Sequence, residues 1–292
     1  MIIVRLNGGL GNQMFQYALG RNLAGILKTQ LKLDRSAFRD DPLREYALSP
    51  FAIQEDFATD KEVADLVFTR RTLLRRVLDK ALQRRPQYAS SYIREKSKFH
   101  FDPEILNLPD GIYLDGSWQC EKYFASNAPT IRQEFTVKEP LKGDNADMAD
   151  RISACDAVSL HVRRGDYVSD PKTNRIHGVC DLEYYSRAIE YLVERVSAPR
   201  LFVFSDEPDW ATEHLHFDIP SQVVGHNPPD QGHEDLRLMA LCKHHVIANS
   251  SFSWWGAWLC VHISPIVICP SRWFRSQEMD SGELIPERWT KI

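Results

Sequence analysis

The chain has 292 residues, of which 43% are hydrophobic and 26% are charged. This balance supports a sizeable buried core, in two domains or one large one, and excludes an intrinsically disordered protein. With 36 basic and 40 acidic residues the net charge is −4, so the overall basic field of a general nucleic-acid-binding protein is absent and no nucleic-acid partner is expected.

The first residues argue against export. A short apolar run at 1–6 turns to glycine before a seven-residue apolar region develops, unlike a secretory signal. No apolar run approaches the length that crosses a bilayer. The six cysteines form no CxxC pair and are too sparse for a disulfide scaffold, so six reduced thiols are expected. These features predict a cytoplasmic protein.

The N-terminal half begins as an α/β chain. Residues 2–6 predict a strand, the glycine turn 7–11 follows, and apolar residues between 15 and 27 predict a helix. A second strand at 30–33 completes the opening of a βαβ unit with a parallel sheet. Residues 62–82 also have a helical pattern, and the basic stretch Arg70–Arg85 forms its polar face. A solvated face is the favoured interpretation, with weak contact to an anionic membrane surface as the alternative.

Residues 138–150 combine a proline, a glycine and many charges, which is typical of a linker. We therefore expect an N-terminal domain over 1–145 and a C-terminal domain over 146–292. Beyond the linker the sequence predicts alternating strands and helices and hence a second Rossmann-like domain: strands at 157–162, 201–204, 245–248 and 266–269, and helices at 182–196, 236–242 and 252–259.

The first glycine turn fits neither common nucleotide fingerprint. Met14 replaces the third glycine of GxGxxG, and no Gly-Lys-Ser/Thr follows as in a P-loop. A tight strand-to-helix turn is the simpler interpretation. However, Asn12 and Gln13 place two amides where the helix begins, at the edge of the sheet where α/β proteins bind ligands.

Polar residues also follow the strand at 157–162. His161 and Arg163 share one face by strand alternation, whereas Arg164 points elsewhere. A guanidinium fork matches two phosphate oxygens, so this pattern favours an anion site over a surface pair of either arginine with Asp166.

Two further strand ends carry candidate ligand groups. Ser250 or Ser251 is a natural N-cap, and together with the free amides of the first helical turn they could also hold a phosphate. Asp206 either binds a guanine edge or ribose hydroxyls, or caps the following helix. The nearby tryptophans are expected in a core or domain interface: Trp254, Trp255 and Trp258.

Metal-ligand patterns are poor. There is no Asp-x-Asp and no HExxH, and His244 and His245 are neighbours on a predicted strand and so face oppositely. A pyrophosphate leaving group would therefore need protein cations, which Arg163 and Arg164 supply. No metal and no cofactor is expected.

Taken together, the motifs at 8–18, 161–167 and 249–259 resemble the bacterial α-1,2-fucosyltransferases of glycosyltransferase family 11, over almost the whole chain. The resemblance implies a GT-B-like architecture of two Rossmann-type domains facing across a cleft, with the donor GDP-L-fucose on the C-terminal one. It also implies transfer with inversion and without an obligatory metal. The segment 115–124 is similar to a family segment, but Ser117 and Cys120 stand where Tyr and Ser are expected.

The resemblance implies a role for each candidate. The donor side would comprise Arg163 on the β-phosphate, Arg164 as a second arginine, His161 and Asp206 near the guanosine, and Ser250, Ser251 and the Phe252 amide on phosphate. Asn12, Gln13 and the segment containing Trp118 would border the acceptor, a galactose-terminated glycan. Arg163 would act in catalysis with Asp166 as the first candidate base, although a carboxylate paired with arginine is a weaker base and could simply orient Arg163. The rivals are a fucosyltransferase of other linkage and a non-catalytic nucleotide- or glycan-binding Rossmann protein.

Overall fold

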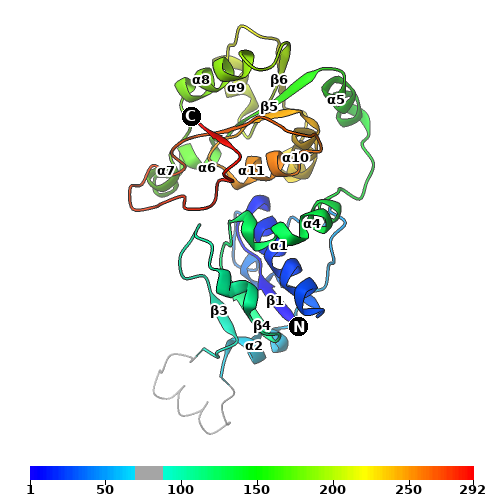
Figure 1. Ribbon diagram of the computed structural model, residues 1–292, viewed down its shortest axis with the longest axis vertical. Coiled ribbons are helices and arrows are strands. Elements are labelled where there is room, and N and C mark those ends of the chain that lie inside the picture. The colour runs from blue at the N-terminus through cyan, green and yellow to red at the C-terminus, as the bar shows by residue number, and fades with distance from the viewer. Residues whose placement is uncertain (70–87) are drawn as a thin grey trace. The chain divides into compact units, whose positions relative to one another are not determined.

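A computed structural model of the chain describes residues 1–69 and 88–292 (Figure 1). Its backbone contacts define two compact units. Unit 1 consists of Met1–Ser49 and Ile53–Phe135, and unit 2 consists of Pro50–Ala52 and Thr136–Ile292. None of the helices in these described ranges combines the length and apolar character that a bilayer crossing requires.

Unit 1 is built on a parallel four-stranded sheet in the order β2-β1-β4-β3. The strands are β1 (Ile2–Arg5), β2 (Leu31–Asp34), β3 (Tyr92–Arg94) and β4 (Ile112–Asp115). The α-helices among its described residues are α1 (Leu10–Leu27), α2 (Asp60–Val67) and α4 (Ala128–Glu134). Helix α1 packs closely on the sheet at Gly20, where a Cβ atom would lie 2.8 Å from Leu31 Cδ1.

Unit 2 contains a six-stranded parallel sheet in the order β7-β6-β5-β8-β9-β10. The strands are β5 (Asp156–Val162), β6 (Pro199–Ser205), β7 (Ser221–Val224), β8 (His244–Val246), β9 (Val267–Cys269) and β10 (Thr290–Lys291). Numbered from β5, this is the Rossmann order 3-2-1-4-5-6. The order reverses between β5 and β8, and ligands of such sheets bind at the carboxyl ends of the strands at this point.

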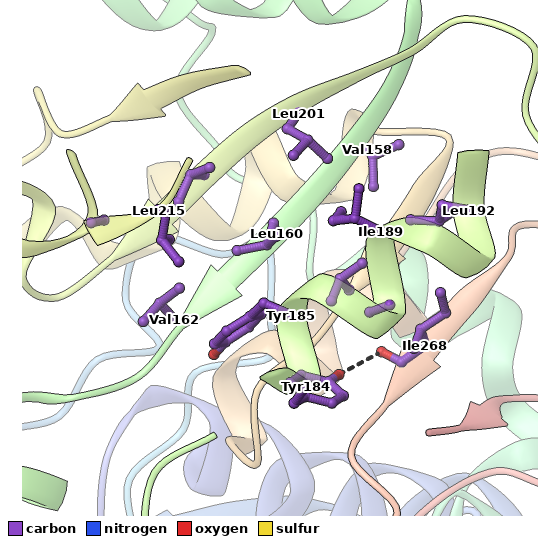
Figure 2. Close-up of a cluster of buried hydrophobic side chains, with 14 of the residues drawn as sticks. Val158, Leu160, Val162, Tyr184, Tyr185, Ile189, Leu192, Leu201, Leu215 and Ile268 are labelled. Atoms are coloured by element: carbon purple, nitrogen blue, oxygen red, sulfur yellow. Dashed lines mark hydrogen bonds between the residues drawn. The ribbon is translucent and has the colours of Figure 1, made fainter. Parts of the chain in front are cut away.

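The helices of unit 2 bury both faces of its sheet. They are α5 (Gly143–Ser153), α6 (Gly165–Ser169), α7 (Pro171–His177), α8 (Leu182–Val193), α9 (Pro208–His214), α10 (Gly232–Leu241) and α11 (Ser251–Trp258). Figure 2 shows α8 packing Tyr185, Ile189 and Leu192 onto the even-numbered residues of β5, Val158 and Leu160 among them. The opposite face packs against α5 and α10. The three tryptophans of α11 are buried in the core, as the sequence indicates.

The α/β class and two Rossmann-type domains predicted from the sequence are confirmed. The domain boundary needs correction, because position 145 falls inside α5 and the contacts divide the chain between Phe135 and Thr136 instead. Residues 50–52 join unit 2 since Phe51 forms an antiparallel bridge with Val137. The predicted basic helix is described only as far as α2, so Arg70–Arg85, and with it both the solvated face and the alternative of weak membrane contact, lies outside the described residues.

Candidate functional site

Arg163 follows β5 and lies between two carboxylates. Its Nη2 is 2.6 Å from Asp166 Oδ1, and its Nη1 is 2.9 Å from Asp206 Oδ2. Burial lowers the pKa of the guanidinium, but the charges of Asp206 and Asp166 outweigh burial and the pKa stays above its ordinary value. Arg163 is therefore a fixed cation at the carboxyl end of the first strand of the Rossmann order.

Asp206, after the end of β6, holds the turn that carries Arg163. Its Oδ1 accepts a hydrogen bond from the Arg164 backbone N–H at 2.9 Å. Gly165 lies against the same carboxylate, and a Cβ atom there would lie 2.5 Å from Asp206 Oδ2. The capping interpretation offered by the sequence is wrong for Asp206, since Glu207 is the N-cap residue of α9. In this structure both carboxylate oxygens of Asp206 bind the 163–165 turn.

The Arg164 side chain contacts partners other than those of Arg163. Its Nε donates to Glu207 Oε2 at 2.8 Å, and its guanidinium lies 3.8 Å from the centre of the Trp210 ring. An ion pair and a stacked aromatic ring together fix the side chain. These contacts support a structural role for Arg164.

His161 is buried beneath this turn at 4% exposure. Burial, together with the charge of Arg163, lowers the pKa of His161 to about 3, so the ring is neutral near pH 7. Its Nδ1 has no hydrogen-bond partner in the described part of the chain, and the ring lies 5.4 Å from that of Phe252. A neutral imidazole with an unused nitrogen can exchange a hydrogen bond with a ligand, but it is a poor proton acceptor at neutral pH.

The amino end of α11 follows β8, the neighbour of β5 in the sheet. Ser250 is its N-cap residue, and its side chain accepts from the Phe252 N–H at 3.3 Å. The cap predicted for this region is thus confirmed at Ser250. Ser251 begins the helix and is half-buried. The sheet topology therefore places Arg163 and the 250–252 turn on the two strands between which the order reverses.

The predicted acceptor-side residues lie in unit 1, where two of them are interior. Gln13 is fully buried, and its side chain bonds the backbone of Gly8, Glu45 and Ala47 at 2.8–2.9 Å. Trp118 is 1% exposed and adopts a positive φ of 55°. These contacts indicate that both side chains support the local structure.

Asn12 is only half-buried, and its Oδ1 accepts from Gln119 Nε2 at 2.8 Å. This contact joins the glycine turn after β1 to the segment after β4. In the sheet order β2-β1-β4-β3 these two strands are neighbours. Asn12 is thus the acceptor-side candidate that lies nearest to solvent at this edge.

Glu95, which follows the short strand β3, is a residue that the sequence does not single out. Its two carboxylate oxygens accept from the backbone N–H groups of Ser117 at 2.7 Å and Trp118 at 3.1 Å. Burial raises the pKa of this carboxyl, although the two amide hydrogen bonds oppose that effect. Glu95 thus fixes the backbone of the predicted acceptor segment. No motif marks it, because its role arises from a partner 22 residues along the chain.

No cluster of three or more His, Cys, Asp or Glu side chains arranged to hold a metal ion occurs within residues 1–69 and 88–292.

Comparisons with known proteins cover the whole chain. The model of glycosyl transferase family 11 matches residues 1–292. An α-1,2-colitosyltransferase of Escherichia coli is 33% identical, with 100% of this chain and 99% of that protein aligned. The Escherichia coli O-antigen biosynthesis glycosyltransferase WbnK is 30% identical over 98% and 99% of the two chains. A rat galactoside α-(1,2)-fucosyltransferase 1 is 29% identical over 53% of this chain and 44% of its own. Among solved structures, POFUT1 in complex with GDP-fucose covers 92% of this chain and 97% of its own at 15% identity, with a TM-score of 0.49.

Proposed function

This chain belongs to glycosyl transferase family 11, and on that premise we propose that it transfers L-fucose from GDP-L-fucose to the 2-hydroxyl of a terminal galactose, with inversion. The observation that carries the donor assignment is the position of Arg163. A fixed guanidinium stands at the reversal point of a Rossmann sheet, beside the amino end of α11. Guanidinium groups and helix amino ends both bind phosphate oxygens.

In the proposed mechanism, unit 2 binds the leaving group. Arg163 binds the β-phosphate through its guanidinium fork, while Ser250, Ser251 and the Phe252 amide bind the remaining phosphate oxygens. His161 forms one hydrogen bond with the guanosine portion of the donor, as either donor or acceptor. Asp206 and Arg164 keep the turn in place, and Asp206 is also the candidate contact to the guanine edge.

The reaction is a single displacement. The acceptor hydroxyl oxygen bonds to the anomeric carbon as the bond from that carbon to the β-phosphate oxygen breaks, and GDP leaves with the electron pair. The hydroxyl proton passes to a base, for which Asp166 is the candidate in catalysis. Its 2.6 Å contact with Arg163 also supports an orienting role. Stabilising the charge that develops on the phosphate is the main contribution expected of the protein.

A second donor is also supported, because the 33% identical relative bears the name of a colitosyltransferase. Colitose is fucose without the 3-hydroxyl, so the same phosphate site would serve either GDP-sugar. A pocket that hydrogen-bonds the 3-hydroxyl would reject the deoxy sugar strongly, whereas an apolar pocket would discriminate weakly.

The test is incubation with GDP-fucose or GDP-colitose and a panel of glycans, with GDP release measured and the product linkage determined by NMR. We expect an α-1,2 product on galactose-terminated acceptors with GDP-fucose. A product formed only from GDP-colitose would change the donor, and another linkage would change the acceptor assignment. GDP binding without GDP release at any acceptor would indicate a non-catalytic binding protein.

A further inference from the structure

A second site lies at the same edge of the unit 2 sheet. A cavity of about 350 Å³ is bounded by the end of α7, the start of α8 and the segment 270–275 that follows β9. Arg163, Asp206 and Ser250 do not line it. Its volume falls in the range of small-molecule sites, which is about 300–1,000 Å³.

Three arginines line this cavity: Arg187 on α8, and Arg272 and Arg275 after β9. Within the described residues, none of the three has a carboxylate oxygen within the 4.0 Å of an ion pair. This distinguishes them from Arg163 and Arg164, which are both paired. Like charges gathered without counter-ions repel one another, so folding alone does not favour the arrangement.

Two of the guanidinium groups are held in place. Arg272 Nε donates to the Phe274 carbonyl at 3.0 Å, and Arg275 Nη1 donates to Asn174 Oδ1 at 2.7 Å. Asn249 connects the end of α7 to the segment after β9, since its Nδ2 donates to the carbonyls of His177 at 2.9 Å and Trp273 at 3.1 Å. Arg272 and Arg275 are therefore positioned before any ligand arrives, and that lowers the entropic cost of binding.

The acidic groups at the cavity do not neutralise it. Asp181 is the acidic side chain among the lining residues, and it caps α8 by accepting from the Tyr184 N–H at 2.8 Å. Burial raises the pKa of Cys180 to about 12, so this thiol is uncharged. Three arginines thus line the cavity with one acidic side chain, so the lining side chains carry an excess of positive charge.

We propose that this cavity binds an oxyanion, a phosphate or carboxylate group carried by a saccharide. Guanidinium forks match both groups, and Arg187, Arg272 and Arg275 all line this one cavity. Assignment of that saccharide to the acceptor rests on the proposed function. The anion site itself does not, because its residues are separate from Arg163.

The test is an NMR titration of ¹⁵N-labelled protein in low-chloride buffer with saturating GDP. The probes are inorganic phosphate, glucuronate and, as the uncharged arm, galactose. We expect amides of 174–181 and 270–275 to shift with the anions and not with galactose. The variant R187Q/R275Q should weaken anion binding by about tenfold or more, as expected when hydrogen bonds to a charged group are removed. R200Q removes an exposed arginine from the same unit and should have no effect.

The single variant R187Q is titrated as well, in case R187Q/R275Q misfolds. The Arg187 side chain is exposed on the surface of α8, so its replacement leaves the core intact. The proposal is overturned if neither anion shifts these amides, or if R200Q weakens binding as much as the double variant does. It is also overturned if R187Q/R275Q loses GDP affinity in parallel, because the cavity would then belong to the donor site. Repeating the titration on R163A without GDP separates the two proposals. Anion binding should persist there even in a protein that transfers no sugar.

Discussion

Arg163 is the residue on which the donor proposal depends most, and its environment sets the size of the expected effect. Removing a bidentate partner of the phosphate destabilises the transition state by about 2–4 kcal/mol. We expect R163A to reduce kcat/KM by about 30-fold to 1,000-fold with the fold intact, and R163K to recover little, since an ammonium group cannot form the fork. Steady-state kinetics with varied donor and a circular dichroism spectrum provide the measurement. Near wild-type turnover by R163A at both low and saturating donor would exclude Arg163 from the site.

Glu95 offers a second test at the residue scale, one that separates positioning from stability. In E95Q an amide group replaces one carboxylate oxygen and faces the backbone N–H of Ser117 or Trp118, so a hydrogen bond worth about 1–3 kcal/mol is removed. We expect the KM for acceptor to rise several-fold while the Kd for GDP stays constant. E104Q, in an exposed position of unit 1, is the control. Equal changes in acceptor KM and GDP affinity would contradict a role confined to the acceptor segment.

At the scale of elements, β5 and β8 share a buried polar pair. Ser159 Oγ lies 2.8 Å from His245 Nδ1, and both side chains are fully buried. Burial, with the nearby His244 and His262, lowers the pKa of His245 to about 3. In the unfolded chain it returns to about 6.5. The folded form therefore stays neutral while the unfolded form gains a proton, and stability present above pH 6.5 is lost as the pH falls towards 3.

The expected decrease in the free energy of unfolding between pH 7 and pH 5 is about 2 kcal/mol for this one histidine. Urea unfolding of wild type and H245Q at both pH values measures it. The variant should have a lower free energy of unfolding at pH 7 and a shallower dependence on pH. An identical pH dependence in the two proteins would show that His245 does not carry this linkage.

The elements show what the sequence can predict. Short, mainly apolar runs such as 2–4 and 157–162 indicate buried parallel strands, and serine before an apolar helix indicates the α11 cap, because these signals are local. The roles of Asp206 and Glu95 escape the sequence because their partners lie 42 and 22 residues away along the chain. Gln13 stands in a recognisable motif, but its amide satisfies three backbone groups that no spacing rule reveals.

For the whole molecule, we expect turnover to be independent of metal. The expectation is motivated by the absence of Asp-x-Asp from the sequence and by the Arg163 guanidinium at the proposed phosphate site. Activity should survive excess EDTA. Loss of turnover on chelation, restored by magnesium or manganese, would show that Arg163 is not sufficient to stabilise the leaving group.

The two units should also divide the substrates between them. S251A should weaken GDP binding by about 1–2 kcal/mol for one hydrogen bond to a charged group. N12A should leave GDP affinity unchanged and lower the use of acceptor. Calorimetric titration with GDP and kinetics with varied acceptor distinguish these effects, and S186A, on the exposed side of α8, is the control. N12A losing as much GDP affinity as S251A would place unit 1 in the nucleotide pocket. Trp118 is a less suitable position than Asn12 for this test, since truncating a buried tryptophan costs about 3–5 kcal/mol of stability.

The short excursion of residues 50–52 into unit 2 bears on recombination between family members. Ala52 donates its N–H to the Thr136 carbonyl and Lys138 donates to the Pro50 carbonyl, at 2.9 Å each, so these residues form one small antiparallel patch. Consider a chimaera that joins residues 1–135 of one enzyme to the remainder of another in order to exchange acceptor specificity. It would carry residues 50–52 from one parent and the segment that they pair with from the other. Designs should keep 50–52 from the same parent as 136–138, with crossovers at three junctions of the chain.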